Sequence, residues 1–305
     1  MTFDQIQSFY LVATLGTFQQ AAERLNATQP AISARIAALE DRLNVRLFDR
    51  SGHRASLTVQ GQRFLVHAEQ MLEARSKALL ELGQVSQMDG VLRIGSSDTL
   101  VISWLPDFVV RLRETFPKIN VGVRVHASPL LREDLLSQEI DIAFVLGPLS
   151  HPSIVNHPLC ECRMGLVALP ELGLHGRALS AEDLNGQDLL TFEKLTRPYQ
   201  ELQSDLRRHR ISVRSNPISA LHSIVVLTRK GLGIGVIPLI AVEDELRSGA
   251  LVELQAPFDL PPLVFTISYL TGPGMAMNEA VAQQALLYMS DLPESRFIKK
   301  IDELA

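Results

Sequence analysis

The sequence predicts an α/β protein with a helical N-terminal region, one long helix, and a larger C-terminal region of alternating strands and helices. Three observations lead to this fold class. Short amphipathic helices separated by tight turns open the chain, apolar residues then recur every seven positions, and short apolar runs alternate with helical patterns from residue 91 onward. With 305 residues, the chain is longer than one typical core requires, so more than one domain is expected.

The first 58 residues are predicted to form a winged helix-turn-helix. Gly16 ends the first helix, and Thr17 is placed to cap a short second helix over 18–25. Thr28 is placed to cap a third helix that runs to about residue 43, with Pro30 in its first turn, where a missing N–H does no harm. Strand-like segments at 47–50 and 56–58 bracket a turn at 51–54, which is the pattern of a β-hairpin wing.

The next segment, 59–87, is predicted to be one long helix with an apolar stripe. A sustained seven-residue repeat favours a seam between two helices, because no other helix in this segment is expected to cover it. Packing of the helix on its own domain is the alternative. The stripe consists of Phe64, Met71, Ala78 and Val85, the parallel row Leu65, Leu72 and Leu79, and Leu82.

From residue 89 the pattern alternates, which predicts parallel sheets with ligand sites beyond the carboxyl ends of the strands. One helix is expected over 99–116, with Pro106 as the place for a bend, and the lone Trp104 is interpreted as a core or interface residue. The other expected helices cover 129–137, 199–209, 218–229 and 278–290. The expected strands cover 91–95, 121–125, 140–145, 159–163, 166–169, 189–192, 234–237 and 263–270.

The order of these parts resembles the LysR-type transcriptional regulators over nearly the whole chain. Many positions match in one register, and Gly231 to Pro238 matches the late effector-domain motif of the family. Beyond Met289 nothing is matched, and the tail around 297–300 is expected either to be loose or to pack on a partner. The strongest matched positions are Phe18, Ala21, Ala22, Leu25, Thr28, Gln29, Pro30, Ala31, Ile32, Ser33, Ile36, Leu39, Glu40, Leu47, Phe48, Asp49, Arg50, Leu57, Thr58 and Gly61.

The resemblance implies a division into a winged helix-turn-helix DNA-binding domain (1–58), a dimerising linker helix (59–88) and an effector domain (89–305). The effector domain is expected to resemble type 2 periplasmic binding proteins. Its first lobe is placed at about 91–160 and 268–292, and its second lobe at about 163–265. The partners implied are double-stranded DNA with partial dyad symmetry, a small-molecule effector, and further copies of the chain as a dimer or tetramer.

The third helix is the expected recognition helix, whose first turn would enter the major groove. Gln29 can pair bidentately with adenine, and Ser33 can contact a base or a phosphate. Pro30 offers an apolar edge to a thymine methyl group, while Thr28 caps the helix and is also placed to touch phosphate. For Gln29 and Ser33 the alternative is a merely exposed helix face.

Basic residues complete the predicted DNA-binding set. Many family members carry an arginine directly after the recognition-helix serine. Here Ala34 follows Ser33, and Arg35 comes one position later. This shift of one residue rotates the side chain by about 100° around the helix. Arg50 and Arg54 are assigned to the wing, where they suit phosphate or the minor groove. An ion pair with Asp49 or Glu40 is the alternative for Arg50.

The effector site is predicted where polar residues follow the strands of both lobes. Gly95–Thr99 follows the first strand and opens a helix, so hydroxyls and free N–H groups there suit a carboxylate. Asp98 would repel an anion unless it caps a helix, and Arg197 would either clamp a carboxylate or lie solvated at its helix start. The predicted effector-binding residues are Ser96, Ser97, Thr99, Ser128, Leu146, Gly147, Thr191, Phe192, Arg197, Ser219 and His222.

Composition and motif spacing argue against other functions. The net charge of −5 lies in the later part of the chain, because residues 1–88 contain 9 Lys and Arg against 8 Asp and Glu. No catalytic residue, metal site or cofactor is predicted, because no metal-ligand spacing and no nucleophile motif is found. Cys160 and Cys162 are expected to point to opposite faces of a strand and to be ordinary buried residues.

The function predicted is that of a cytoplasmic, DNA-binding transcriptional regulator controlled by a small organic acid or aromatic effector bound between the two lobes. It is not expected to be an enzyme or to contact a membrane. The alternative is a cytoplasmic two-lobed solute-binding protein or an enzyme with an incidental helical head. The absence of an export signal and of an acid–base constellation counts against this alternative.

Overall fold

The computed structural model describes residues 1–49, 55–82, 90–272, 275–293 and 295–301. The chain divides into two compact units. The first contains residues 1–93, 110–122 and 269–284, and the second contains residues 94–109, 123–268 and 285–305.

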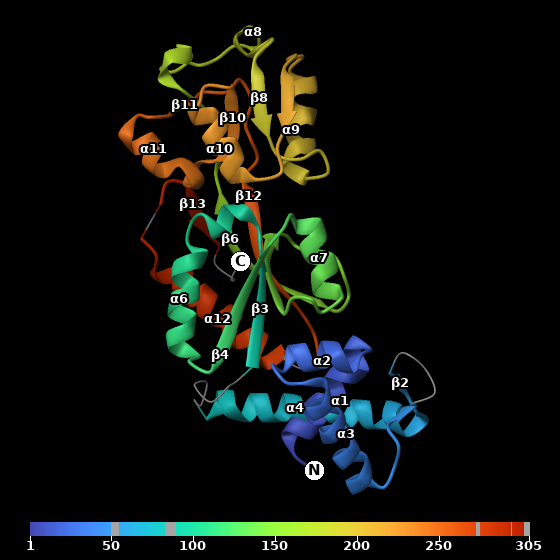
Figure 1. The fold of residues 1–305 in the computed structure, drawn as a ribbon. Helices are drawn as coiled ribbons and strands as arrows, with labels where there is room; N and C mark the ends of the chain where they lie inside the picture. The colour runs from blue at the N-terminus through green and yellow to red at the C-terminus, as the bar shows by residue number, and fades with distance from the viewer. Residues whose placement is uncertain (50–54, 83–89, 273–274, 294, 302–305) are drawn as a thin grey trace. The chain divides into compact units, whose positions relative to one another are not determined.

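The head of the first unit is built from three helices and a short hairpin (Figure 1). These elements are α1 (Phe3–Leu15), α2 (Phe18–Arg24), α3 (Gln29–Leu43), β1 (Phe48–Asp49) and the antiparallel β2 (Ser56–Leu57). The side chains of Thr17 and Thr28 accept hydrogen bonds from N–H groups in the first turns of α2 and α3. Gly16 ends α1 with φ 80°, a left-handed conformation that glycine adopts without steric cost. The expected helix-turn-helix is therefore present.

Aromatic rings form the centre of the head's core. The Phe9 ring lies 5.3 Å from Phe48 and 5.0 Å from Phe64, and Phe18 lies 5.7 Å from Phe48, measured between ring centroids. Phe9 and Ile32 are fully buried in this core. These contacts join α1, α2, the hairpin and the long helix, so the hairpin is fixed to the helices that it follows.

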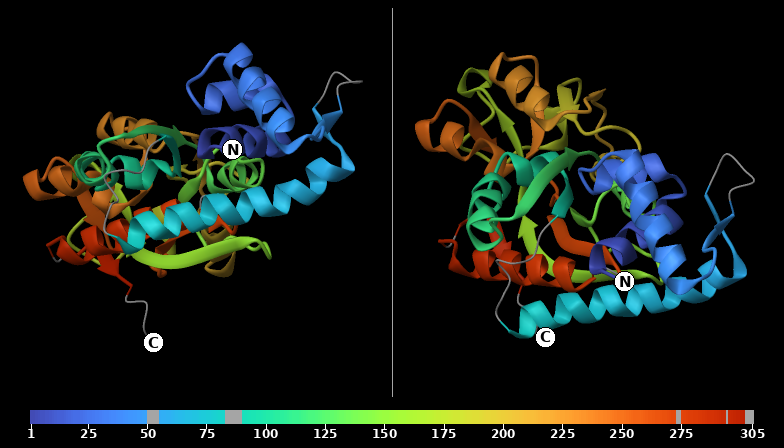
Figure 2. Two further views of the ribbon diagram at one scale, coloured as in Figure 1. Left: turned by 90° about the horizontal axis from the view of Figure 1, so that it is seen from below. Right: turned by 60° about the horizontal axis from the view of Figure 1, so that its bottom comes forward.

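The long helix α4 spans Val59–Glu81 (Figure 2), and the expected end at residue 87 lies outside the described residues. Half of its apolar stripe is covered within its own chain. Phe64, Leu65, Met71 and Leu72 pack against the head's core, and α1 contacts α4. The expectation that no helix of this segment covers the stripe was therefore wrong for its first half. Leu82 is 72% exposed, whereas Val85 lies outside the described residues.

A six-stranded sheet has the order β13-β6-β12-β5-β3-β4. It includes a parallel pair, β3 with β5, and an antiparallel pair, β13 with β6. The sheet is therefore mixed, whereas a parallel sheet was expected. The strands are β3 (Gly90–Ser96), β4 (Ile119–Val125), β5 (Ile142–Leu146), β6 (Ile154–Cys162), β12 (Leu263–Leu270) and β13 (Ile298–Lys300). The helices of this part of the chain are α5 (Asp98–Val101), α6 (Leu105–Thr115), α7 (Ser128–Leu136) and α12 (Met275–Asp291).

A five-stranded sheet has the order β11-β7-β10-β8-β9 and is also mixed. Its strands are β7 (Met164–Ala168), β8 (Asp188–Thr191), β9 (Arg214–Pro217), β10 (Ile234–Pro238) and β11 (Val252–Leu254). The helix α10 (Leu221–Arg229) packs on β10 and β8 (Figure 1). The remaining helices here are α8 (Ala181–Leu184), α9 (Arg197–Arg208) and α11 (Glu243–Ser248), with short 3₁₀ turns at Pro170–Leu172 and Leu239–Val242.

The helix expected over 99–116 is two helices, α5 and α6, separated by a turn at 102–104. Pro106 is the second residue of α6, and a proline ring there clashes with the carbonyl of a continuing upstream turn, so the chain restarts instead of bending. Trp104 lies in this turn, is 5% exposed, and contacts the rings of Phe108, Phe144 and Tyr288. Its interpretation as a core residue is confirmed.

β12 belongs to the six-stranded sheet from Leu263 onward, close to the expected end of the second lobe at about residue 265. One further expectation was wrong at the far end of the chain. The tail is neither loose nor left for a partner, because Ile298–Lys300 pairs with β6 as strand β13.

The expectation that Cys160 and Cys162 face opposite sides of their strand was also wrong. Residues two apart on a strand share a face, and here the two thiols are close enough to hydrogen bond to each other. Both cysteines are free and fully buried. The hydrogen bond with Cys162, together with burial, raises the pKa of the Cys160 thiol well above its usual value, so ordinary buried cysteine remains the right interpretation.

Candidate DNA-reading head and effector site

The start of α3 has the geometry of a recognition helix. Thr28 Oγ1 accepts from the Ala31 N–H at 3.4 Å, so the side chain caps the helix as expected. Thr28, Gln29 and Pro30 are exposed, whereas Ser33 is half-buried one turn later. The first turn therefore presents the Gln29 amide and the Pro30 ring to solvent, on a helix whose other face is held in the core.

A buried carboxylate connects α3 to the wing. Glu40 is 2% exposed, and its Oε1 accepts from the Leu47 N–H at 2.7 Å and the Phe48 N–H at 3.2 Å. Its Oε2 pairs with Arg46 at 2.8 Å. Burial disfavours the charged form, but these hydrogen bonds outweigh it and lower the pKa of Glu40. The sequence pattern did not assign this role to Glu40.

The basic residues of the predicted set are only partly described by the structure. Arg35 is half-buried, and Ala34 is the exposed residue at the position where many family members carry arginine. Arg50 and Arg54 lie outside the described residues. The alternative of an ion pair between Arg50 and Asp49 or Glu40 therefore also lies outside the described residues, and Glu40 pairs with Arg46.

The predicted effector residues of the six-stranded sheet meet where β3 and β5 end. Ser96 and Thr99 are buried, and the Ser97 N–H donates to the Phe144 carbonyl. Ser128 Oγ accepts from the Leu146 N–H at 3.0 Å, so this hydroxyl holds the end of β5. Because α5 has a single turn, its dipole is weaker than that of the long helix expected from the sequence.

The predicted residues of the five-stranded sheet divide into two groups. Thr191 is fully buried at the end of β8, and Phe192 follows it, packed against the core of this sheet. Ser219 and His222 are exposed at the entry to α10. Arg197 begins α9, and its side chain is 45% exposed, with Glu201 at 3.6 Å from its Nε.

Within the second unit, two hydrogen bonds connect residues that flank the six-stranded sheet to residues that flank the five-stranded sheet. Asp98 Oδ2, from α5, accepts from the Leu221 N–H of α10 at 3.1 Å. Arg197 donates to the Gly147 carbonyl at 3.5 Å. Asp98 was expected to cap the helix that it opens, but it instead caps α10, which packs on the five-stranded sheet. Arg197, at the start of α9, likewise reaches the loop that follows β5. Its guanidinium is held by the Gly147 carbonyl and by Glu201.

Two buried hydroxyls near these connections have no hydrogen-bond partner among the described residues. They are Ser97 Oγ, directly before Asp98, and Thr191 Oγ1, at the end of β8. A buried polar group without a partner costs about 1–3 kcal/mol, so such groups are rare, and bound water or a ligand is one way to satisfy them. One unpaired hydroxyl therefore lies next to Asp98, at the end of β3, and the other lies at the end of β8.

A buried polar network supports the loop that Arg197 contacts, and the sequence did not reveal it. Asn156 Oδ1 accepts from the Leu149 N–H at 2.9 Å and from Ser268 Oγ at 2.7 Å, and its amide donates to the Leu149 carbonyl at 3.1 Å. A Cβ on Gly147 would collide with the Thr266 side chain, so this position requires glycine. The loop is therefore held rigidly beside the effector residues.

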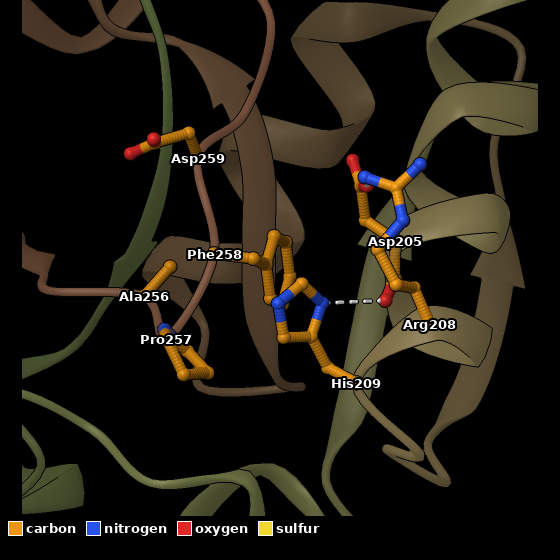
Figure 3. A pocket seen from close by; sticks show the side chains of 7 residues that line it. All are labelled: Asp205, Arg208, His209, Ala256, Pro257, Phe258 and Asp259. Carbon is orange, nitrogen blue, oxygen red and sulfur yellow. Dashed lines mark hydrogen bonds and ion pairs between the residues drawn. The ribbon is translucent and has the colours of Figure 1, made fainter.

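A surface pocket of about 500 Å³ lies elsewhere, between the end of α9 and the segment 256–259 (Figure 3). The His209 ring lies against the Phe258 ring with 5.5 Å between centroids, and its Nδ1 lies 2.9 Å from the Asp205 carbonyl oxygen. None of the predicted effector residues lines this pocket. The described part of the chain contains no group of three or more metal-ligating side chains and no helix long and apolar enough to cross a membrane.

Comparison with known proteins identifies the family. Residues 3–62 match the model of the bacterial regulatory helix-turn-helix protein, lysR family, and residues 86–285 match the LysR substrate binding domain. The HTH-type transcriptional regulator GltR of Bacillus subtilis is 26% identical over 252 residues, which are 82% of this chain and 84% of the relative.

Solved structures have the same fold. A full-length OxyR variant from Pseudomonas aeruginosa has a TM-score of 0.62 at 22% identity, with 94% of this chain and 95% of that chain covered. Full-length CbnR in complex with its target DNA has a TM-score of 0.51 at 22% identity, with 93% and 100% covered.

The chain combines a helix-turn-helix head with a substrate-binding domain, which is the architecture of a transcriptional regulator and not of an enzyme. It belongs to the LysR family of transcriptional regulators, whose members bind DNA and small-molecule effectors.

Proposed function

We propose that this regulator reads an operator of partial dyad symmetry as a dimer or tetramer in the cytoplasm. The domain roles follow the expected division: residues 1–58 bind DNA, 59–88 form the dimerising linker, and 89–305 bind the effector. The observation that carries the DNA-reading proposal is the exposed, capped first turn of α3 on a packed head. Residue by residue, Gln29 reads a base, Thr28, Pro30, Ser33 and Arg35 support the contact, and Arg50 and Arg54 serve the wing.

The DNA-reading proposal is tested by selection from a randomised duplex pool with the full chain, followed by titration of the enriched sequence at several salt concentrations. We expect enrichment of a sequence with two related half-sites and a steep loss of affinity with salt, because phosphate contacts release counterions. A pool that shows no enriched sequence, or binding that does not depend on salt, would contradict the proposal.

The effector is proposed to be a small organic acid or aromatic compound bound between the two sheets, by residues of the second unit. The unpaired hydroxyls of Ser97 and Thr191 support this site, together with the two connections between the sheets. Ser96, Thr99, Ser128, Leu146, Gly147, Phe192 and Arg197 form its surroundings, and Ser219 and His222 its entrance. A ligand that binds both sheets favours the arrangement in which both contacts exist, and this difference in affinity is the basis of regulation.

Asp98 sets a condition on an anionic effector. Its carboxylate already caps α10, so a ligand carboxylate that approaches this helix start competes with a charge of the same sign. A screen of small acids and their neutral amides by thermal shift on the full chain tests the effector proposal, because a ligand of the folded state raises the melting temperature. If no compound raises it, or if the binders protect Thr191→Val equally, the site lies elsewhere.

A further inference from the structure

The chain continues beyond the part that matches the family models, and this continuation returns to both sheets, at residues of the second unit. The substrate-binding match ends at residue 285, whereas the structure shows an ordered segment at Phe297–Ile301. We call residues 297–301 the C-terminal strap.

The first residue of the strap is anchored in the core of the five-stranded sheet. Phe297 is 1% exposed and packs in the cluster that contains Val167 of β7, Ile224 of α10 and Ile237 of β10. Burial of a phenylalanine side chain contributes roughly 1.5–3 kcal/mol, so this is a strong anchor for a terminal segment.

The next residues of the strap are anchored in the other sheet. Ile298, Lys299 and Lys300 pair with Cys162, Glu161 and Cys160 of β6, and the Ile301 N–H donates to the Leu159 carbonyl. Lys300 Nζ donates to the carbonyls of Ser290 and Leu292 at the end of α12, at 2.8 and 2.6 Å. Lysine at a helix C-terminus satisfies orphan carbonyls and complements the dipole. Consecutive residues of the strap, Phe297 and Ile298, are thus fixed to different sheets.

The strap lies directly beside a crossing of the chain between the sheets. Arg163 is the single residue between β6 and β7, which belong to different sheets. Its N–H donates to the Phe297 carbonyl at 2.9 Å, and its carbonyl accepts from the Leu239 N–H at 2.9 Å. The crossing residue is therefore held by the strap on one side and by the five-stranded sheet on the other.

We propose that the C-terminal strap is a brace that restrains movement between the two sheets at Arg163. Rotation of one sheet against the other must either pull Phe297 out of its core or break the pairing of Ile298 with Cys162. Phe297 and Lys300 are positioning residues in this arrangement, since they act through the crossing. The strap therefore keeps the two walls of the effector site near one relative orientation and limits how far a ligand changes it.

The first test is hydrogen exchange of the Arg163 amide in the full chain. Phe297→Ala removes the anchor, and Lys300→Met removes the helix-capping ammonium while keeping an apolar stem. We expect Arg163 to exchange about tenfold faster in both variants, while amides of β5 keep their protection, because only the crossing opens. Phe297→Leu, which keeps an apolar anchor, should restore most of the protection.

The matched control is Lys299→Met, on the same strand with the same charge removed. Its side chain is 78% exposed, with Glu161 at 4.0 Å, so exchange at Arg163 should stay as in the parent. Unchanged exchange in Lys300→Met would overturn the brace, as would faster exchange at β5 to the same degree as at Arg163. Lys300→Met keeps the test valid if Phe297→Ala does not fold.

A second test measures the movement itself. Spin labels on Glu133→Cys of α7 and Arg207→Cys of α9 report the distance between the two sheets, and the buried native thiols stay unlabelled. We expect a single narrow distance distribution in the parent and a broader one with Lys300→Met, but not with Lys299→Met. Equal distributions in all three would overturn the proposal. Neither test uses DNA or an effector, so its outcome is separate from that of the proposed function.

Discussion

Replacement of Glu40 should loosen the connection between α3 and the wing. The carboxylate accepts from the Leu47 and Phe48 N–H groups at 2.7 and 3.2 Å, and both bonds are buried. Hydrogen bonds to a charged group contribute about 1.5–3 kcal/mol each, and their losses do not add fully, so Glu40→Ala should lower the head's stability by roughly 2–5 kcal/mol. Glu40→Gln keeps one acceptor oxygen and should cost less than half as much.

The lowered pKa of Glu40 also predicts how the stability of the head changes with pH. The folded-state pKa of Glu40 lies below its ordinary value of 4.5, so the ionised carboxylate stabilises the head above that pH. This stability is lost as the pH falls through the lower folded value, so the difference between parent and Glu40→Gln should shrink with acid.

The assay is hydrogen exchange of Leu47, Phe48 and the core amides of α1 in the full chain, at neutral pH and at a pH well below 4.5. Faster exchange at Leu47 and Phe48 in Glu40→Ala, with a smaller change in Glu40→Gln, is expected. Equal protection in all three proteins, or a difference that grows with acid, would refute the reasoning.

Three other substitutions test separate parts of the molecule. Gln29→Ala should weaken binding to the selected operator by about 1–3 kcal/mol and leave random DNA unaffected, whereas equal losses in a titration would show that no base is read. Leu82→Lys should weaken self-association in sedimentation, because Leu82 is exposed directly after the end of α4, and unchanged assembly would remove that residue from the interface. Leu72→Lys should instead destabilise the head against which Leu72 packs. Asp98→Asn should tighten binding of small carboxylates in calorimetry, and a loss of thermal stability with unchanged affinity would limit Asp98 to its helix-capping role.

The sequence predicted the parts of the fold that depend on neighbouring residues. Threonine caps at 17 and 28 and the left-handed glycine at 16 act within a few residues, and the structure confirms all three. The restart of the helix at Pro106 was missed because a proline near a helix start and a proline within a helix look alike until the upstream turn is known.

Contacts between residues that are far apart in the sequence could not be predicted from sequence patterns. Asp98 and Leu221 are 123 positions apart, and nothing in either segment indicates that one caps the helix that begins at the other. Phe297 lies beyond every matched motif, and only its burial shows that it belongs to the core of a sheet that ended some forty residues earlier. The predicted effector residues were found because they follow strands, but which hydroxyls remain unpaired depends on side-chain geometry.

The most direct test of effector control is the affinity of the full chain for its selected operator, at one fixed salt concentration, with and without the small acid or amide that stabilises it best. The parent and Thr191→Val are compared, because the threonine hydroxyl is buried and unpaired among the described residues and valine preserves its shape. We predict that the compound changes operator affinity several-fold in the parent and has little effect in Thr191→Val, while both proteins bind the operator equally without it. An equal response in the two proteins, or no response in the parent, would contradict control through this site.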